Sequence, residues 1–177
     1  QGRYTADIAP HDALHAVFVR SPIARGHLRH LSVDVARAAP DVVAVLTALE
    51  AAQDGVANMV WTGAPVRDDG LAVVDSPRPL LSGSAIRHLG EPICMVVAKT
   101  RQAAMDALEL VDAVYDTDDA VALSIKDLNE PLVWPESSDN IAALHRVGDK
   151  QAVDAALAAA TTVVRFDFDV SKVTACP

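Results

Sequence analysis

The chain has 177 residues, of which 51% are hydrophobic and only 4% aromatic, so it can bury one substantial core built mainly from Ala, Val and Leu. Its formal net charge of −9 comes from dispersed acidic side chains and argues against a general nucleic-acid or anionic-membrane surface. No run of 18 apolar residues occurs, and two cysteines, Cys94 and Cys176, are too few for a disulfide framework or a cysteine-ligated metal site.

The first part of the chain predicts three strands after an irregular lead-in. Residues 14–20 (LHAVFVR) are apolar on both faces, which is typical of an interior strand. Residues 31–35 (LSVDV) alternate as a half-exposed strand does, and a helical turn that ends before Pro40 follows. Residues 42–46 (VVAVL) predict another apolar strand, and residues 47–52 predict the start of a helix.

The longest irregular stretch covers residues 55–84, which we call the excursion. Seven Gly and Pro residues interrupt every regular pattern in it, and its only apolar segment is short. Loops of this length in compact domains are usually functional or mobile, so the excursion is a first place to look for a function.

A βα unit at the middle of the chain organises the prediction. Residues 92–98 contain a near-continuous apolar run of the kind found in strands that are buried on both faces. Thr100 can cap a helix over residues 101–114, whose apolar positions recur at helical spacing. Glu109 and Asp112 fall on the polar side of that helix, where we expect both to be solvated.

The last part of the chain predicts a second helix between strands. A capping box opens a short helix over residues 124–129, and residues 141–147 form a strand. Asp149 can cap an Ala-rich helix over residues 150–160. Residues 164–170 (VRFDFDV) alternate apolar and charged side chains, which makes this segment the clearest half-buried strand in the sequence.

Together these elements predict a single α/β (α+β) domain over residues 1–177, with a mixed β-sheet and helices packed on it. The chain opens on Gln1 rather than Met, so we expect it to be a piece of a longer protein. Two inert thiols are expected in a reducing compartment, which favours the cytoplasm, with the periplasm as the alternative.

Two common catalytic motifs are absent. A phosphate-binding loop needs closely spaced glycines between a strand and a helix, but the link after residue 98 is Lys99-Thr100. A nucleophile elbow needs Gly-x-Ser-x-Gly, and Leu81-Ser82-Gly83-Ser84 lacks that pattern. The sequence therefore does not support a nucleotide-binding enzyme or an independent small hydrolase.

The histidines do not predict a metal site. His11 and His15 stand four apart, but Pro10 precedes them and His15 falls in a predicted strand, so helical spacing does not apply. His27 and His30 lack a carboxylate or cysteine at ligand spacing. We interpret these four, and the isolated His88 and His145, as solvated or singly hydrogen-bonded side chains.

Glu91 is the carboxylate best placed for chemistry, since it stands between Gly90 and Pro92 at the mouth of the buried strand. One interpretation makes it a catalytic base. The other, which we favour, is that Gly-Glu-Pro forms a tight turn in which Glu91 accepts hydrogen bonds from nearby backbone donors. No acid, base and oxyanion site assemble around it in the sequence.

Several short segments occur in an order that resembles a known family. They are Gly2-Arg3-Tyr4 with Asp7-Ile8, residues 14–22, residues 40–47, residues 86–93, residues 98–104, and Arg146-Val147-Gly148-Asp149 with the helix after it. In this order, over essentially the whole chain, they resemble the N-terminal α/β-hammerhead domain of molybdenum hydroxylase large subunits, which include xanthine dehydrogenases, aldehyde oxidases and carbon monoxide dehydrogenases.

The resemblance implies an oxidoreductase that hydroxylates an aldehyde or an N-heterocycle. It also implies molybdopterin, in its cytosine dinucleotide form, within the large subunit, and 2Fe–2S clusters and FAD in companion domains or subunits. In the family, a segment like residues 173–177 leads into the molybdopterin-binding domains that carry the catalytic glutamate. We therefore assign no catalytic, cofactor-binding or metal-binding residue to this chain.

Our leading hypothesis is a non-catalytic structural and docking domain of such an enzyme. Its expected partners are the remaining molybdopterin-binding domains of the large subunit, an iron–sulfur subunit and a flavin subunit, with no nucleic acid and no membrane segment. The excursion is a candidate lining for the substrate entrance. The alternative is a stand-alone binding or assembly module that uses the same fold without redox activity.

Overall fold

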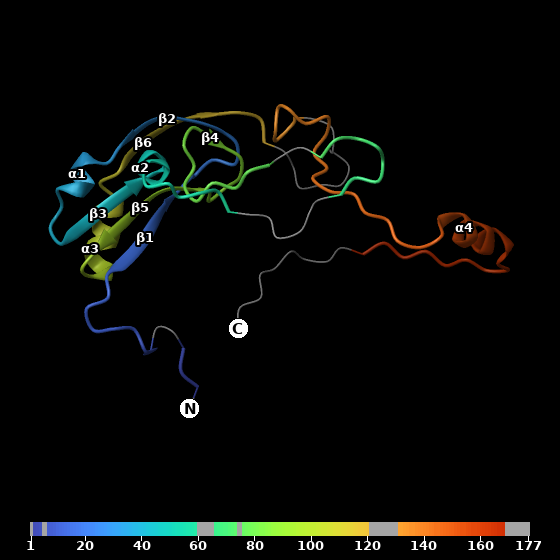
Figure 1. The fold of residues 1–177 in the computed structure, drawn as a ribbon, viewed down its shortest axis with the longest axis horizontal. Helices are drawn as coiled ribbons and strands as arrows, with labels where there is room; N and C mark the ends of the chain where they lie inside the picture. Colours follow the sequence, from blue (N-terminus) through green and yellow to red (C-terminus); the bar gives the residue numbers. More distant parts are fainter. Residues whose placement is uncertain (1, 5–6, 60–65, 74–75, 121–130, 169–177) are drawn as a thin grey trace. The chain divides into compact units, whose positions relative to one another are not determined.

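A computed structural model describes residues 2–4, 7–59, 66–73, 76–120 and 131–168 (Figure 1). The chain divides into two compact units, Gln1–Leu144 and His145–Pro177. Among the described residues, no helix has the length and apolar character needed to cross a membrane.

The first unit contains two three-stranded sheets (Figure 1). One sheet has the order β1-β5-β3 and the other has the order β4-β2-β6, and every pairing between these strands is antiparallel. Successive strands of the chain therefore alternate between the two sheets. The strands are β1 (His15–Arg20), β2 (Gly26–Ser32), β3 (Val42–Thr47), β4 (Ala85–Ile86), β5 (Pro92–Ala98) and β6 (Asp112–Thr117).

The described residues of the same unit also form three short helices, and their presence beside the sheets confirms the expected α/β class. They are α1 (Asp34–Arg37), α2 (Ala48–Gln53) and α3 (Arg101–Leu108). We expected one mixed sheet, whereas the described strands form two antiparallel sheets. This arrangement arises because β1 and β3 both pair with β5 but are separated in sequence by β2, which pairs in the other sheet.

The core lies between one face of the β1-β5-β3 sheet and the helices α1 and α3. Cys94, Val96 and Ala98 on β5 are fully buried, and so are Ala104 and Ala107 on α3. Alanine at these two helix positions lets α3 approach the sheet closely. The βα unit predicted from the sequence is therefore the centre of the fold.

Capping side chains define where two of the helices begin, and both starts were predicted, the one at Thr100 with its cap. The Thr100 hydroxyl accepts a hydrogen bond from the backbone N–H of Ala103 at 3.1 Å and starts α3. At α2, the Glu50 carboxylate accepts a hydrogen bond from the backbone N–H of Thr47 at 2.7 Å and completes a capping box. These local signals explain why both helix starts could be predicted.

The first strand was predicted correctly in position but wrongly in environment. Residues 14–20 were expected to be an interior strand, whereas β1 is at the edge of its sheet, beside the central strand β5. Val17 and Val19 pack on the core, and Phe18 lies on the opposite face. Apolar residues on both faces thus do not mean that a strand has neighbours on both sides.

The strand predicted over residues 31–35 was misplaced. The observed strand, β2, begins five residues earlier at Gly26, and the helix α1 occupies residues from Asp34 onward. Val33 is buried at the start of α1, whereas Val35 is 62% exposed, so the apparent alternation does not continue into a strand. The short apolar segment fits a strand end and a helix start equally well.

β2 can begin where it does because residue 26 is glycine. Gly26 pairs with Ile86 of β4 and with Thr117 of β6, and its φ is +147°. A Cβ atom at this position would lie 1.9 Å from the carbonyl oxygen of Asp116. Any other residue would push β6 away from β2.

The helix predicted over residues 101–114 is shorter than expected. It ends at Leu108, with Glu109 as its C-cap, and β6 begins at Asp112. The two carboxylates do not share a helix face, although both are exposed as expected. The segment 112–117 joins β2 because pairing along a whole strand outweighs the local preference to extend a helix.

The second unit contains α4 (Lys150–Ala159), which Asp149 caps through a hydrogen bond from the N–H of Ala152. This helix confirms its prediction. The strands expected over 141–147 and 164–170 are wrong for the residues described, which form no strand, and Phe166 and Phe168 are each 82% exposed. A strand pattern needs a partner strand. Among the described residues, 164–168 have none, and 141–147 have a single isolated bridge from Leu144 to Arg67 in the first unit. Residues 124–129 and 169–170 lie outside the described residues.

Candidate functional site

Glu91, the carboxylate singled out by the sequence, is buried at the start of β5 with only 6% of its surface exposed. One carboxylate oxygen accepts a hydrogen bond from the hydroxyl of Ser82, which is also buried. The other accepts a hydrogen bond from the backbone N–H of Arg87 at 2.6 Å. The expectation that Glu91 accepts from a nearby backbone donor is confirmed.

The same cluster includes a histidine that appeared isolated in the sequence. His88 Nδ1 lies 3.6 Å from the second carboxylate oxygen of Glu91 and forms an ion pair with it when protonated. The imidazole is 66% exposed, so it meets Glu91 from the solvent side. The cluster ties residues 82–91 into one turn before β5 and leaves Glu91 with both oxygens engaged.

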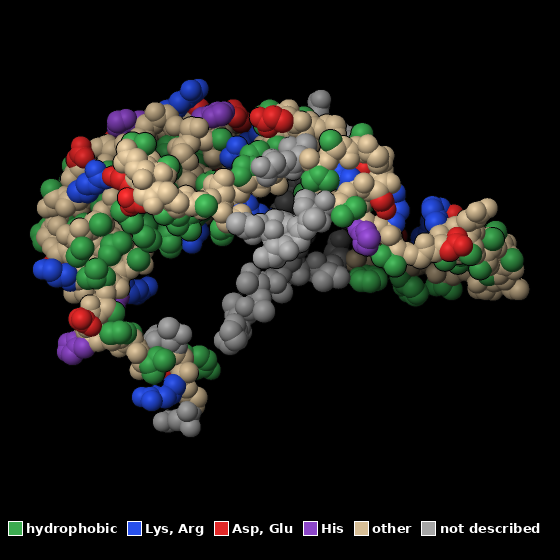
Figure 2. Space-filling view, viewed as in Figure 1, with side chains coloured by type: hydrophobic (Ala, Val, Ile, Leu, Met, Phe, Trp, Pro, Cys, Tyr) green, Lys and Arg blue, Asp and Glu red, His purple; other side chains and the backbone are tan. Residues whose placement is uncertain are grey.

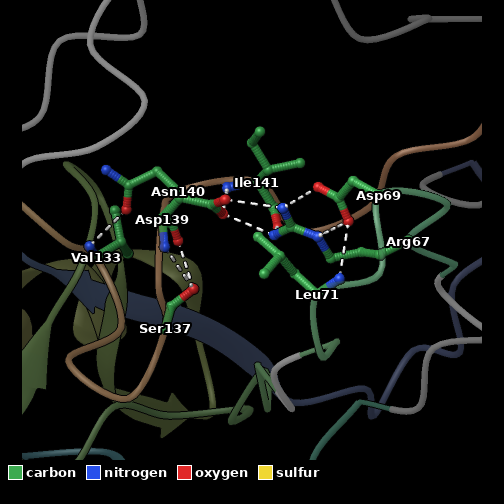
Figure 3. A network of polar contacts seen from close by, with 8 residues as sticks. All are labelled: Arg67, Asp69, Leu71, Val133, Ser137, Asp139, Asn140 and Ile141. Atoms are coloured by element: carbon green, nitrogen blue, oxygen red, sulfur yellow. Dashed lines mark hydrogen bonds and ion pairs between the residues drawn. The ribbon is translucent and has the colours of Figure 1, made fainter.

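A second polar network joins two loops that are far apart in the sequence (Figure 3). The Arg67 side chain, only 2% exposed, donates to both oxygens of Asp139 at 2.7 and 2.8 Å. It also donates to both oxygens of Asp69 at 3.1 and 2.6 Å and to the carbonyl oxygen of Ile141 at 2.9 Å. One guanidinium therefore fixes the excursion against residues 139–141.

These contacts shift the pKa values of both carboxyl groups downward. Hydrogen bonding from the Arg67 guanidinium lowers the pKa of Asp69 to about 2. The same donor, helped by the backbone N–H of Ile141, holds the pKa of Asp139 below its ordinary value. In return, the two carboxylates raise the pKa of Arg67, so that all three groups stay charged at any ordinary pH.

Residues 131–141, which we call the clasped loop, are held by three arginines from different parts of the chain. Arg25 donates to the carbonyl oxygen of Leu132 at 3.0 Å. The Arg87 guanidinium lies 3.8 Å from the centroid of a Trp134 ring, which is a cation–π contact. Arg67 binds the far end of the loop through Asp139. The loop is thus ordered without a helix or strand of its own.

The described residues of the excursion form no helix or extended strand, as predicted. Two isolated bridges hold them: Met59 pairs with Arg78, and Arg67 pairs with Leu144. The excursion is therefore an ordered loop where it is described, packed against the clasped loop. That it lines a substrate entrance stays a prediction.

An open hollow of about 300 Å³ lies between β2 and the start of α2. Its walls are residues 28–31, residues 47–49 and Ser82-Gly83. Arg29 contributes to the wall, but its side chain is paired with Asp116 on β6. The hollow holds no catalytic pair of residues.

The histidines behave largely as the sequence suggested. His27 Nε2 lies 3.7 Å from the Asp118 carboxylate on the exposed side of β2, while His11, His15, His30 and His145 are exposed. Within the described ranges, no three His, Cys, Asp or Glu side chains gather as metal ligands. His88 fits the same interpretation, since its side chain is 66% exposed and lies beside one carboxylate, that of Glu91.

Cys94 is an unreactive core thiol. It is fully buried on β5, and this burial raises the pKa of its thiol to about 11. Cys176 lies outside the described residues.

Sequence reasoning missed the Arg67 network completely. Arg67 and Asp139 are 72 residues apart, and each lies in a loop without periodicity. The single local signal is Asp69, two residues from Arg67, whose carboxylate also accepts a hydrogen bond from the N–H of Leu71. Such an Asx-type turn marks an ordered loop but does not reveal its distant partner.

Comparison with known proteins shows the family to which this fold belongs. Residues 1–119 match the family described as aldehyde oxidase and xanthine dehydrogenase, a/b hammerhead domain. The nicotine 6-hydroxylase large subunit of Paenarthrobacter nicotinovorans is 31% identical over the whole chain, which covers 21% of that relative. The crystal structure of a Cu,Mo-CO dehydrogenase matches 91% of this chain and 21% of its own, at 26% identity and a TM-score of 0.69.

Quinoline 2-oxidoreductase from Pseudomonas putida 86 matches 73% of this chain and 16% of its own, at 29% identity and a TM-score of 0.61. Together, these matches and the two-sheet α/β fold define the class of domain. The chain belongs to the aldehyde oxidase and xanthine dehydrogenase family, and the matched region is its hammerhead domain. The chain spans about a fifth of the length of the curated relatives it matches.

Proposed function

We propose that this chain is a structural and docking domain in the large subunit of a molybdopterin-dependent oxidoreductase that hydroxylates aldehydes or N-heterocycles. In this proposal residues 1–177 act as one domain of a larger subunit and supply no catalytic residue. The single observation that carries the proposal is the state of Glu91, whose two carboxylate oxygens are both bound to the chain's own donors.

The other buried polar groups support the same conclusion. The Arg67 guanidinium uses its donors on Asp69, Asp139 and a backbone carbonyl. Cys94 is buried and protonated at neutral pH. A catalytic group must have at least one free atom that faces a substrate, and these groups are occupied in holding the chain together.

Among the described residues, no three His, Cys, Asp or Glu side chains gather as metal ligands, and the link between β5 and α3, Lys99-Thr100, has no glycine that would let a phosphate approach the backbone. The proposal therefore assigns molybdopterin, expected as the cytosine dinucleotide, to the remaining domains of the large subunit. It assigns 2Fe–2S clusters and FAD to companion subunits or domains, in a reducing compartment such as the cytoplasm.

Replacing Glu91 by Gln in the complete enzyme tests the proposal. Loss of the negative charge at the buried site weakens its hydrogen bonds, so we expect the enzyme to lose about 1–3 kcal/mol of stability. The turnover number should change by less than about twofold, because no reacting atom touches this side chain. Thermal denaturation and steady-state kinetics measure the two effects.

The matched control is Glu109→Gln, which changes an exposed carboxylate at the end of α3. This substitution should alter neither the stability nor the turnover number of the enzyme. A large fall in turnover with unchanged stability in the Glu91→Gln enzyme would overturn the proposal. Metal analysis of the co-expressed assembly separates the docking domain from a stand-alone module, since an assembled complex without molybdenum would favour the module.

A further inference from the structure

The two faces of the central strand are buried to very different extents. Cys94, Val96 and Ala98 point into the core and are fully buried. Met95 and Val97, which alternate with them, point to the opposite face of the sheet and are only half-buried, whereas Ile93, at the irregularity where the strand begins, is fully buried. The described chain therefore covers one face of β5 with helices and leaves the other face partly exposed.

The register of the sheet extends this exposed face across all three strands. Val97 stands directly between Ala16 of β1 and Ala44 of β3, and Met95 stands between Phe18 and Leu46. Residues opposite each other in an antiparallel pair share a face. The result is two apolar rows, which we call the open face: Ala16, Phe18, Ala44, Leu46, Met95 and Val97.

None of these six residues belongs to the buried core cluster, and none is fully buried. Figure 2 shows hydrophobic side chains gathered over the part of the molecule where Figure 1 labels β1, β3 and β5. One charged residue, Arg20, stands at the end of β1 beside these rows. Its guanidinium lies 5.6 Å from the centroid of the Phe18 ring and donates to the carbonyl oxygen of Gly90. The charge is therefore at the margin of the open face and not within it.

An antiparallel sheet that meets water on one side normally alternates apolar and polar residues. β5 does not alternate, since every residue from Ile93 to Ala98 is apolar. A strand of this composition is suited to burial on both faces, but the described chain leaves Met95 and Val97 half-exposed on one of them. The apolar composition of the open face therefore indicates that another part of the polypeptide or another protein covers it.

The size of the open face favours an occupant within the same polypeptide. Stable interfaces between free proteins use roughly 20–30 residues on each side, and the open face has six. A tethered domain needs much less contact, because the linker supplies a high effective concentration. A second copy of this chain is further disfavoured because each copy carries a net charge of −9.

We propose that the open face is the surface on which the cofactor-bearing remainder of the large subunit packs. This inference rests on the proposed function, and it adds which side of the domain makes the contact. Relatives of this chain are about five times as long, so such a remainder exists in them. The contact is apolar side chain to apolar side chain, with Arg20 at its rim.

Photocrosslinking in the full-length large subunit, co-expressed with its companion subunits, tests the inference. p-Benzoylphenylalanine replaces Phe18 in one variant and Leu46 in a second, so that one of them remains if the other fails to fold. The control carries the same probe at Val35, which is 62% exposed on α1, outside the open face. Mass spectrometry identifies the peptide attached to the probe, and molybdenum is measured in the same sample.

We expect the probes at 18 and 46 to attach, within one chain, to peptides beyond residue 177, at a yield at least several-fold above that of the Val35 control. Attachment to a second copy, to a companion subunit or to another part of residues 1–177 would overturn the inference. So would a yield no higher than the control. If molybdenum is present while the crosslinks fall elsewhere, the open-face assignment fails and the proposed function stands. If the assembled complex lacks molybdenum, the proposed function fails.

Discussion

The sheet core and the clasped loop of this domain are ordered by different forces. The β1-β5-β3 sheet and α3 bury small aliphatic side chains such as Val96, Ala104 and Ala107, which are fully removed from water. The clasped loop has no such core and is held by the cationic groups of Arg25, Arg67 and Arg87. Apolar burial is insensitive to pH and depends on side-chain volume, whereas the loop contacts depend on charge and on hydrogen-bond geometry.

This difference implies that the two regions can be perturbed separately. A change of volume in the sheet should destabilise the whole unit, since its packing is shared by several elements. A change of charge in the loops should release the loops and leave the sheet intact. Substitutions that change volume in β5 and charge in the loops test this separation.

Replacing Ile93 by Ala removes a fully buried side chain at the start of β5. The lost apolar contact and the resulting cavity should lower the free energy of unfolding by about 2–5 kcal/mol. Urea denaturation measures this change. Leu89→Ala, at a residue that is 68% exposed, is the control and should have little effect. Equal effects of the two substitutions would show that the sheet core is not the stabilising region.

Replacing Arg67 by Met keeps the length of the side chain but leaves Asp69 and Asp139 without their shared donor. We expect hydrogen exchange to rise by about tenfold or more in residues 66–72 and 131–141, because several charge-assisted hydrogen bonds are lost. Exchange in β5 should stay the same. The control is Arg101→Met, on an exposed position of α3. Faster exchange throughout β5 would contradict the separation of the two regions.

Lowering the pH should release the same loops. Because the pKa of Asp69 is lowered to about 2 and that of Asp139 is also lowered, both carboxylates stabilise the loops fully above the ordinary Asp pKa of about 3.9. This stabilisation is lost as the pH falls through the lowered values. Pepsin, which acts in this range, should cut within residues 66–72 or 131–141 faster at pH 2 than at pH 4.

Cleavage of an unstructured peptide with the same sequence corrects for the pH dependence of pepsin itself. The Arg67→Met variant should already be cut readily at pH 4. If the corrected cleavage rate were the same at both pH values, the ion pairs would not be what orders the loops.

Replacing Thr100 by Ala removes the hydroxyl that caps α3 and should destabilise the unit by about 1 kcal/mol. Thermal denaturation measures the shift, and Thr117→Ala, at the exposed end of β6, is the control. A Ser at position 100 should recover most of the loss, because its hydroxyl can make the same bond. Failure of Ser to recover stability would mean that the methyl group matters more than the cap.

The sequence predicted the parts of the fold that depend on local signals. Thr100 and Asp149 each mark a helix start through a side chain three residues from its donor. The apolar run in β5 is long enough to be identified as a buried strand without knowing its neighbours. The fold family followed from several short segments in order, and the family match to residues 1–119 confirms it.

The errors arose where distant partners decide the structure. Residues 112–117 form a strand instead of continuing the predicted helix because they pair with β2. No local sequence signal near Asp112 indicates that pairing. The pattern of residues 164–168 fits a strand, but the described chain offers it no partner. In the candidate site, the backbone contact of Glu91 was foreseen because its donor is four residues away, whereas the contact between Arg67 and Asp139 spans 72 residues.

The alternation of successive strands between the two sheets has a consequence for how the first unit folds. Neither sheet can be completed from one continuous segment, since β1, β3 and β5 are each followed by a strand of the other sheet. Most pairings therefore join residues that are far apart in the sequence, such as Ala16 with Val97. A topology with this high contact order is typical of slow folding. A partly formed sheet gains little stability, because its strands come from distant segments of the chain. The two sheets should therefore appear together in a single cooperative step.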